Sequence, residues 1–205
     1  MVCSQDRNNF SRAIPRPFGL ANWVTLARCL GALVFLALGA GAAGGVLAIG
    51  ARPRWIIVAT AMAALCLDGV DGHVARRLGQ ASAFGARFDM ETDALQMLAL
   101  SLLVWGVGQA GGWVLFSGLM RYIFILGGWL WPVLSLPLPP RQRRRSVCVA
   151  QIVVLTVALA PPVTPLWAEA ICLAGLALLS YSFGRDLIWL IGRSDREREA
   201  VVEQS

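Results

Sequence analysis

The residues best suited to chemistry are five acidic side chains within 26 positions of one another, out of only 12 acidic residues in the whole chain. They stand at the ends of two strongly apolar runs, and they are Asp68, Asp71, Asp89, Glu91 and Asp93. An ionised group at membrane depth is energetically costly, so such groups are usually retained for a function. The cluster therefore predicts a functional site.

The spacing of four of these acids predicts a shared metal site. Asp68 and Asp71 are three residues apart, and Asp89 and Asp93 are four apart, so each pair lies along one stripe of a helix. If the segment between the pairs reverses the chain, four carboxylates converge and require a cation. Carboxylate oxygens suit one or two Mg²⁺ or Mn²⁺ ions. Glu91 falls off this stripe, which favours helix packing or a dimer interface over metal binding.

The neighbours of the aspartates favour a phosphate-bearing substrate. Gly72, Ala75 and Gly85 continue the two stripes with small side chains that let a ligand approach the helix backbone. Arg76 supplies a fixed positive charge for phosphate oxygens. A metal beside an arginine at a membrane border would stabilise charge on a diphosphate leaving group, and one carboxylate could take a proton from an attacking alcohol.

The same residues resemble the signature of the CDP-alcohol phosphotransferase family, D-x2-D-G-x2-A-R-x8-G-x3-D-x3-D. All eight defined positions are present at the correct spacing: Asp68, Asp71, Gly72, Ala75, Arg76, Gly85, Asp89 and Asp93. The resemblance implies that the four aspartates bind one or two divalent ions and that Asp93 also acts as the general base. It further implies a homodimer, and a donor site for CDP-diacylglycerol formed by Gly72, Ala75, Arg76, Ser82 and Gly85, with Asn22 and Thr25 lining the nucleotide pocket.

The acceptor alcohol is not specified by the signature. Arg121 and Arg185 are isolated cations in apolar runs and are candidates to bind an acceptor phosphate, the alternative being pairing or snorkelling to an interface. Arg28, in the first run, is a similar case with no stronger claim. Met90-Glu91-Thr92 departs from the sequence expected of phosphatidylglycerophosphate synthases, which makes glycerol 3-phosphate a less favoured acceptor.

The elements that position these residues are predicted to be membrane helices. The 205 residues are 57% hydrophobic and only 15% charged, whereas soluble domains are about 25% charged. Apolar runs fall at 20–40, 54–72, 85–108, 112–136, 146–161 and 166–191, separated by glycine-rich or proline-rich breaks. We expect an all-α integral membrane fold of six transmembrane helices, with no soluble surface for a nucleic-acid partner.

The distribution of positive charge predicts how the chain is oriented in the membrane. All 18 cationic residues are arginine, and most lie in the N-terminal arm, the 73–84 and 137–145 loops and the tail. The excess of positive charge in these segments places both termini and the active site on the cytoplasmic side of the cell membrane. The expected organisation is an arm over 1–18, a six-helix catalytic domain over 19–192 and a tail over 193–205.

The sequence thus predicts a metal-dependent transfer of the phosphatidyl group from CDP-diacylglycerol to the hydroxyl of a small polar alcohol, with release of CMP. Two alternatives use similar residues. A UbiA-like membrane prenyltransferase also has aspartate-rich metal sites, but it needs a second aspartate-rich motif and a longer chain. A non-enzymatic divalent-cation transporter also needs intramembrane carboxylates, but it has no need for Gly72, Ala75, Arg76 and Gly85 at fixed spacing.

Overall fold

The computed structural model describes residues 20–77, 83–130 and 142–202, and their side chains over 25–67, 88–123 and 146–188 apart from Asp186. These ranges contain six α-helices and one 3₁₀ turn, Gly112–Val114, and within them there is no strand. The helices are α1 (Leu20–Ala43), α2 (Ala51–Arg77), α3 (Ala83–Gly106), α4 (Leu115–Leu130), α5 (Gln142–Ala158) and α6 (Pro165–Val202). The predicted all-helical fold is confirmed.

Glycines end the first and third helices in the same way. Gly45 and Gly108 have positive φ angles of 71° and 74°, a conformation that costs glycine little because it has no Cβ atom. After α1, the Val46 amide donates to the Gly41 carbonyl at 2.9 Å. After α3, the Gln109 amide donates to the Val104 carbonyl at 3.0 Å. Both are Schellman motifs, so the glycine-rich breaks in the sequence are helix caps.

Two helices extend beyond the apolar runs that predicted them. The second run ends at residue 72, but α2 continues to Arg77, so Arg76 and Arg77 are helical where the sequence predicted a loop. The last run ends at 191, but α6 continues to Val202. Hydropathy reports how deep a residue lies in a membrane, whereas the helix itself ends only where backbone hydrogen bonding stops.

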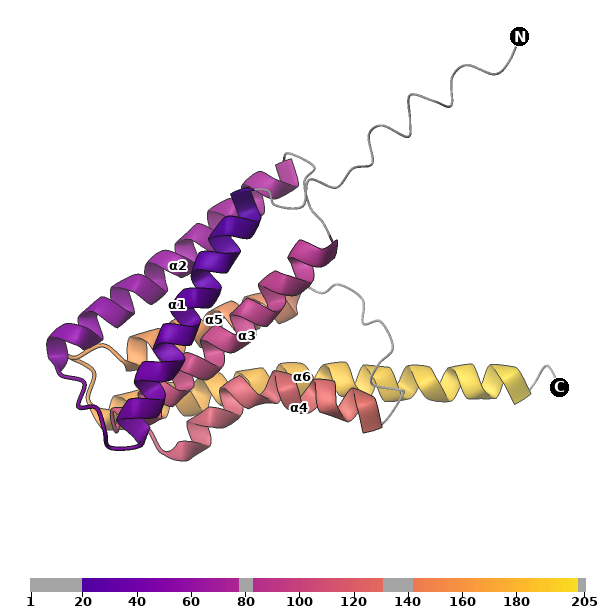
Figure 1. Ribbon diagram of the computed structural model, residues 1–205. Helices are drawn as coiled ribbons and strands as arrows, with labels where there is room; N and C mark the ends of the chain where they lie inside the picture. The colour runs from indigo at the N-terminus through magenta and orange to yellow at the C-terminus, as the bar shows by residue number, and fades with distance from the viewer. Residues whose placement is uncertain (1–19, 78–82, 131–141, 203–205) are drawn as a thin grey trace, which may run out of the picture.

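The third helix is the centre of the bundle, since α3 packs against α1, α4 and α5. Helix α2 leads the chain back, so α1 and α3 run in the same direction side by side (Figure 1). Their contact runs from Arg28 beside Asp89 and Asp93 to Gly106 beside Ala43. The core around α3 is formed by buried aliphatic side chains, among them Leu100, Leu103, Val104, Ile152, Leu155 and Leu159.

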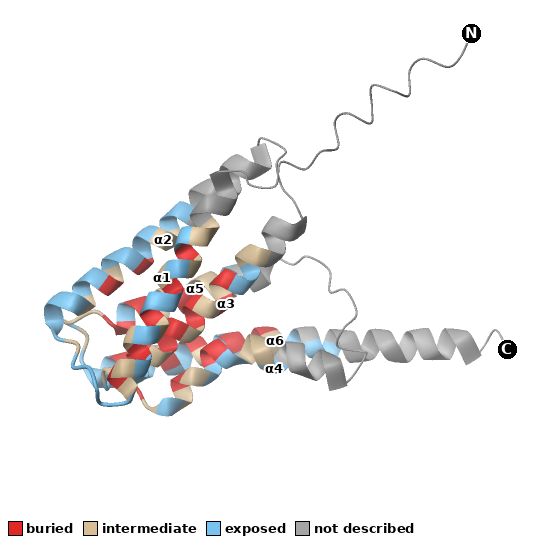
Figure 2. Cartoon of the chain, in the orientation of Figure 1, coloured by how far each residue is buried: buried red, intermediate tan, exposed pale blue. Residues whose placement is uncertain are grey.

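Apolar side chains also cover the outside of the bundle. The outer faces of α1, α2 and α6 expose large hydrophobic residues that include Leu30, Val34, Ile56, Trp167 and Leu173 (Figure 2). In the described residues, two segments are long and apolar enough to cross a membrane, Thr25–Ala43 and Pro165–Arg185, and Ser146–Ala158 is a shorter apolar helix. Exposed apolar faces on helices of this kind are suited to lipid. The described residues form six helices, while six membrane spans stay a prediction.

Candidate functional site

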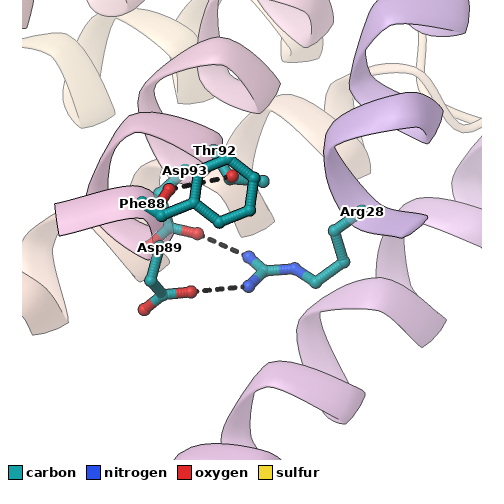
Figure 3. A network of polar contacts seen from close by, with 5 residues as sticks. All are labelled: Arg28, Phe88, Asp89, Thr92 and Asp93. Carbon is teal, nitrogen blue, oxygen red and sulfur yellow. Dashed lines mark hydrogen bonds and ion pairs between the residues drawn. The ribbon is translucent and has the colours of Figure 1, made fainter. Parts of the chain in front are cut away.

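An arginine of α1 joins the two signature carboxylates of α3. The Arg28 Nη1 atom donates to Asp89 Oδ1 at 2.9 Å, and Nη2 donates to Asp93 Oδ1 at 2.5 Å (Figure 3). Asp89 and Asp93 are one helical turn apart, so both carboxylates lie on the face of α3 that meets α1. The planar guanidinium presents its two terminal nitrogens side by side, which matches this separation.

Burial differs between the arginine and its two partners. The Arg28 side chain is 3% exposed, whereas the Asp89 and Asp93 side chains are 26% and 17% exposed. The guanidinium is therefore enclosed by the bundle, whereas part of each carboxylate remains accessible. A buried charge is tolerated only when it is paired and hydrogen-bonded, and the two terminal nitrogens of Arg28 are bonded to two acids.

Sequence reasoning treated Arg28 as an isolated cation similar to Arg121 and Arg185, and did not place it beside the aspartates. Two helices that run in the same direction bring together residues at equal depth. Arg28 is the ninth residue of α1, and Asp89 and Asp93 are the seventh and eleventh residues of α3. The arginine is thus level with the midpoint between the two acids. This match can be recognised only once α1 and α3 are known to lie side by side in the same direction.

Glu91 lies on a different face of α3 from the two aspartates. Its carboxylate forms a short ion pair with Arg121 of α4, and both side chains are partly exposed, at 50% and 32%. The structure agrees with the sequence interpretation that Glu91 points off the aspartate stripe and serves helix packing. It also gives Arg121 the pairing partner that was the alternative to acceptor binding.

Arg185 has an aromatic neighbour one turn earlier on α6. Its guanidinium carbon lies 5.9 Å from the centre of the Tyr181 ring, within the range of a cation–π contact. Both side chains are exposed. The role of Arg121 and Arg185 in acceptor binding stays a prediction.

The other half of the signature is only partly described. Asp68, Asp71, Gly72, Ala75 and Arg76 all belong to α2, but their side chains lie outside the described residues. Gly85 belongs to α3 and Asn22 to α1, and the surroundings of these two residues also lie outside the described set. Ser82 lies outside the described ranges altogether. Thr25 is partly buried on α1, one turn before Arg28 and therefore on the same face.

Two further polar side chains of α3 are buried close to the aspartates. The Thr92 hydroxyl donates to the Phe88 carbonyl at 2.9 Å, so the helix backbone satisfies it (Figure 3). Gln96 lies one turn after Asp93 and is 2% exposed. Within the described part of the chain, neither the nitrogen nor the oxygen of its amide has a hydrogen-bond partner. Buried amides without partners are rare in folded proteins, which marks this position as unusual.

A second polar network closes the opposite end of the bundle. Arg54 of α2 donates to the Leu159 carbonyl at 2.9 Å and to the Ala160 carbonyl at 3.4 Å. Gln109, after α3, accepts from Arg54 Nη2 at 2.6 Å when its amide oxygen faces the guanidinium. These contacts tie α2 to the turns that follow α3 and α5. They satisfy carbonyls left open at helix ends and are structural.

The described carboxylates fit a divalent cation. Asp89 and Asp93 provide hard oxygen ligands on successive turns, they are held side by side by one guanidinium, and they are partly accessible. Two carboxylates are fewer ligands than such an ion needs. Across the described side chains there is no group of three or more residues that could hold a metal. The remaining predicted ligands, Asp68 and Asp71, lie outside that set.

Comparison with known proteins gave one match. The sequence model of the family described as CDP-alcohol phosphatidyltransferase matches residues 18–181. The matched range includes all six helices up to the middle of α6, together with the whole signature. A search of curated proteins found no match. A search of solved structures found none either.

Proposed function

Because the chain belongs to the CDP-alcohol phosphatidyltransferase family, we propose that it transfers the phosphatidyl group of CDP-diacylglycerol to the hydroxyl of a small polar alcohol and releases CMP. Membership itself makes the chain a membrane-associated transferase of phospholipid biosynthesis. The family match favours this reaction over the prenyltransferase and the cation transporter. The identity of donor and acceptor, the metal and the residue roles below belong to the proposal.

The pairing of Asp89 and Asp93 by Arg28 is the observation that supports the proposal most directly. Two adjacent carboxylates repel each other, and the fold holds them together with a buried cation. A merely structural ion pair needs only one acid. Here a second acid joins the same contact, and both acids remain partly accessible. This arrangement is expected of a site that binds a further cation, such as a metal ion held with a phosphate.

We assign the residues as follows. Asp68, Asp71, Asp89 and Asp93 hold one or two Mg²⁺ or Mn²⁺ ions, which when bound offset negative charge on the diphosphate and on the departing CMP. Asp93 accepts the proton of the attacking hydroxyl as general base. Arg76 contacts the phosphate oxygens of the donor. The remaining donor contacts come from Gly72, Ala75, Ser82, Gly85, Asn22 and Thr25.

The acceptor is proposed to approach from the side of α3 that is not covered by Arg28. Arg121 and Arg185 are the candidates for binding a phosphate on it. Each already has a partner within the protein, Glu91 and the Tyr181 ring. An acceptor phosphate must therefore compete with an ion pair at Arg121, whereas at Arg185 it can bind while the ring contact remains.

The proposal includes a cellular arrangement. Six membrane spans over 19–192 would place the arm, 1–18, the tail, 193–205, and the aspartates on the cytoplasmic side of the cell membrane. The arginine-rich segments at these borders support that orientation. Family members commonly form homodimers, and we expect one here, with CDP-diacylglycerol, the acceptor and membrane lipids as the other partners.

The test is CMP release from CDP-diacylglycerol by purified protein in detergent, with a panel of alcohols as acceptors and lipid products identified by mass. We expect release with Mg²⁺ or Mn²⁺ and none after chelation with EDTA. Asp93→Asn should abolish transfer while the variant still folds and still binds CDP-diacylglycerol. No CMP from wild-type protein with any acceptor would overturn the proposed reaction, and wild-type turnover by Asp93→Asn would remove Asp93 from the base role.

A further inference from the structure

Arg28 is the one charged residue of the described core whose contacts the proposed reaction does not explain. It is not part of the signature, and it lies inside the apolar helix α1. A buried arginine is costly unless its charge and its donors are satisfied. Its two terminal nitrogens are directed to the two carboxylates assigned to the metal and the base. The contact therefore links α1 to the chemistry on α3.

The contact brings one guanidinium to two carboxylates. Two ionised acids one helical turn apart repel each other, and a cation that contacts both offsets that repulsion. Arg28 thus reduces the repulsion between Asp89 and Asp93 before any metal cation arrives.

The direction of approach decides between two roles. If Arg28 took the place of a metal ion, it would cover the accessible side of the acids and would have to move away on binding. Instead it is 3% exposed, while the acids are 26% and 17% exposed. It donates to a single oxygen of each, Oδ1 in both cases. Part of each carboxylate is therefore accessible while Arg28 is in position, so a cation can reach the acids without displacing the guanidinium.

We propose that Arg28 is a positioning residue, a permanent counter-ion that holds Asp89 and Asp93 side by side and keeps the carboxylate pair preformed in the metal-free protein. The inference rests on the proposed function for the identity of the cation, but not for the charge compensation itself. Arginine is suited to this role because its fork reaches two acids at once, which the point charge of a lysine does not.

The charge compensation is tested without a metal. In EDTA, Arg28→Gln should unfold at a lower temperature than wild type, because two acids lose their counter-ion. Asp89→Asn should partly restore the unfolding temperature of Arg28→Gln, because it removes the repulsion, so the effects of the two changes are strongly non-additive. Additive effects would overturn the proposal.

The link to the cation is tested by titrating Mn²⁺ and recording the unfolding temperature. Mn²⁺ should stabilise Arg28→Gln more than wild type, with a half-saturating concentration at least tenfold lower, because the ion then supplies the missing positive charge. Arg28→Lys should stay near wild type. Arg54→Gln is the control, since Arg54 is a half-buried arginine that, like Arg28, bonds across helices, but at the far end of the bundle.

The outcomes separate the two proposals. A Mn²⁺ response of Arg28→Gln equal to those of wild type and Arg54→Gln would overturn the counter-ion role. If wild-type protein shows no Mn²⁺ response, the metal site of the proposed function falls, and the comparison of single and double variants in EDTA still decides the role of Arg28.

Discussion

A close backbone contact between two helices provides a quantitative test of the fold. Gly118 of α4 faces the backbone of α3, and a Cβ atom added there would lie 2.4 Å from Leu98 Cα and 2.8 Å from the Leu98 amide nitrogen. Ordinary contacts between such atoms are about 3.5–4.0 Å. Gly118→Ala must therefore move the two helices apart by roughly 1 Å, because backbone atoms, unlike the end of a flexible side chain, cannot turn aside.

Gly31→Ala is the matched control for this change. Gly31 is also a helical glycine, in α1, and a Cβ atom there meets nothing within 4 Å. Both changes gain the helix propensity of alanine, about 1 kcal/mol, so that gain cancels when the two variants are compared. The difference between them is the cost of overpacking alone. It is about 1–3 kcal/mol in general, and we expect a value near 3 kcal/mol because the clash is with backbone.

The measurement is thermal unfolding of the two purified variants in the same detergent. For a chain of this length, 1 kcal/mol corresponds to about 2–4 °C, so Gly118→Ala should unfold roughly 6–12 °C below Gly31→Ala. The Mn²⁺ response should be preserved in the folded fraction of both, since Arg28 and its acids lie between α1 and α3. Unfolding temperatures that agree within about 2 °C would refute the close packing of α3 on α4.

Three further predictions concern polar contacts. Gln96→Leu should raise the unfolding temperature, since it removes a buried amide whose unmet hydrogen bonds cost about 1–3 kcal/mol each; a lower temperature would mean that residues outside the described set satisfy the amide. Arg54→Gln should lower stability by about 1.5–3 kcal/mol through loss of its bonds to the Leu159 and Ala160 carbonyls, read from unfolding at equal detergent concentration. Glu91→Arg and Arg121→Glu should each lower stability by about 0.2–1 kcal/mol, and the variant that carries both changes should regain the lost stability. A double variant less stable than either single variant would contradict the ion pair.

The breaks after α1 and α3 and before α6 were predictable because each has a local cause. Gly45 and Gly108 adopt a backbone conformation that other residues avoid, and Pro165 begins α6 with the fixed φ angle that suits a first helical turn. These signals depend on single residues and their neighbours, so they can be read without knowledge of the fold. The ends of α2 and α6 were not predictable from hydropathy, because Arg77 and Val202 belong to helices that continue past their apolar segments.

The site was predictable in its residue types but not in its contacts. Asp89 and Asp93 share a stripe because the α-helix has a fixed period, and the structure has them on one face. Which residue contacts that face is decided by the tertiary fold. Arg28 lies 61 residues before Asp89, and the pair forms only because α1 and α3 run side by side in the same direction. Arg121 shows the same limit, since its partner Glu91 is set by the packing of α4 on α3.

The two arginine contacts of α3 suggest why the helix keeps three acids so close together. Arg28 is buried and contacts two acids, Asp89 and Asp93. Arg121 is partly exposed and contacts one acid, Glu91. Glu91 lies two residues from each aspartate, so without Arg121 its charge would add to theirs. By pairing Glu91 with its own arginine, the protein keeps that charge away from the face of α3 where Asp93 is proposed to meet the acceptor hydroxyl.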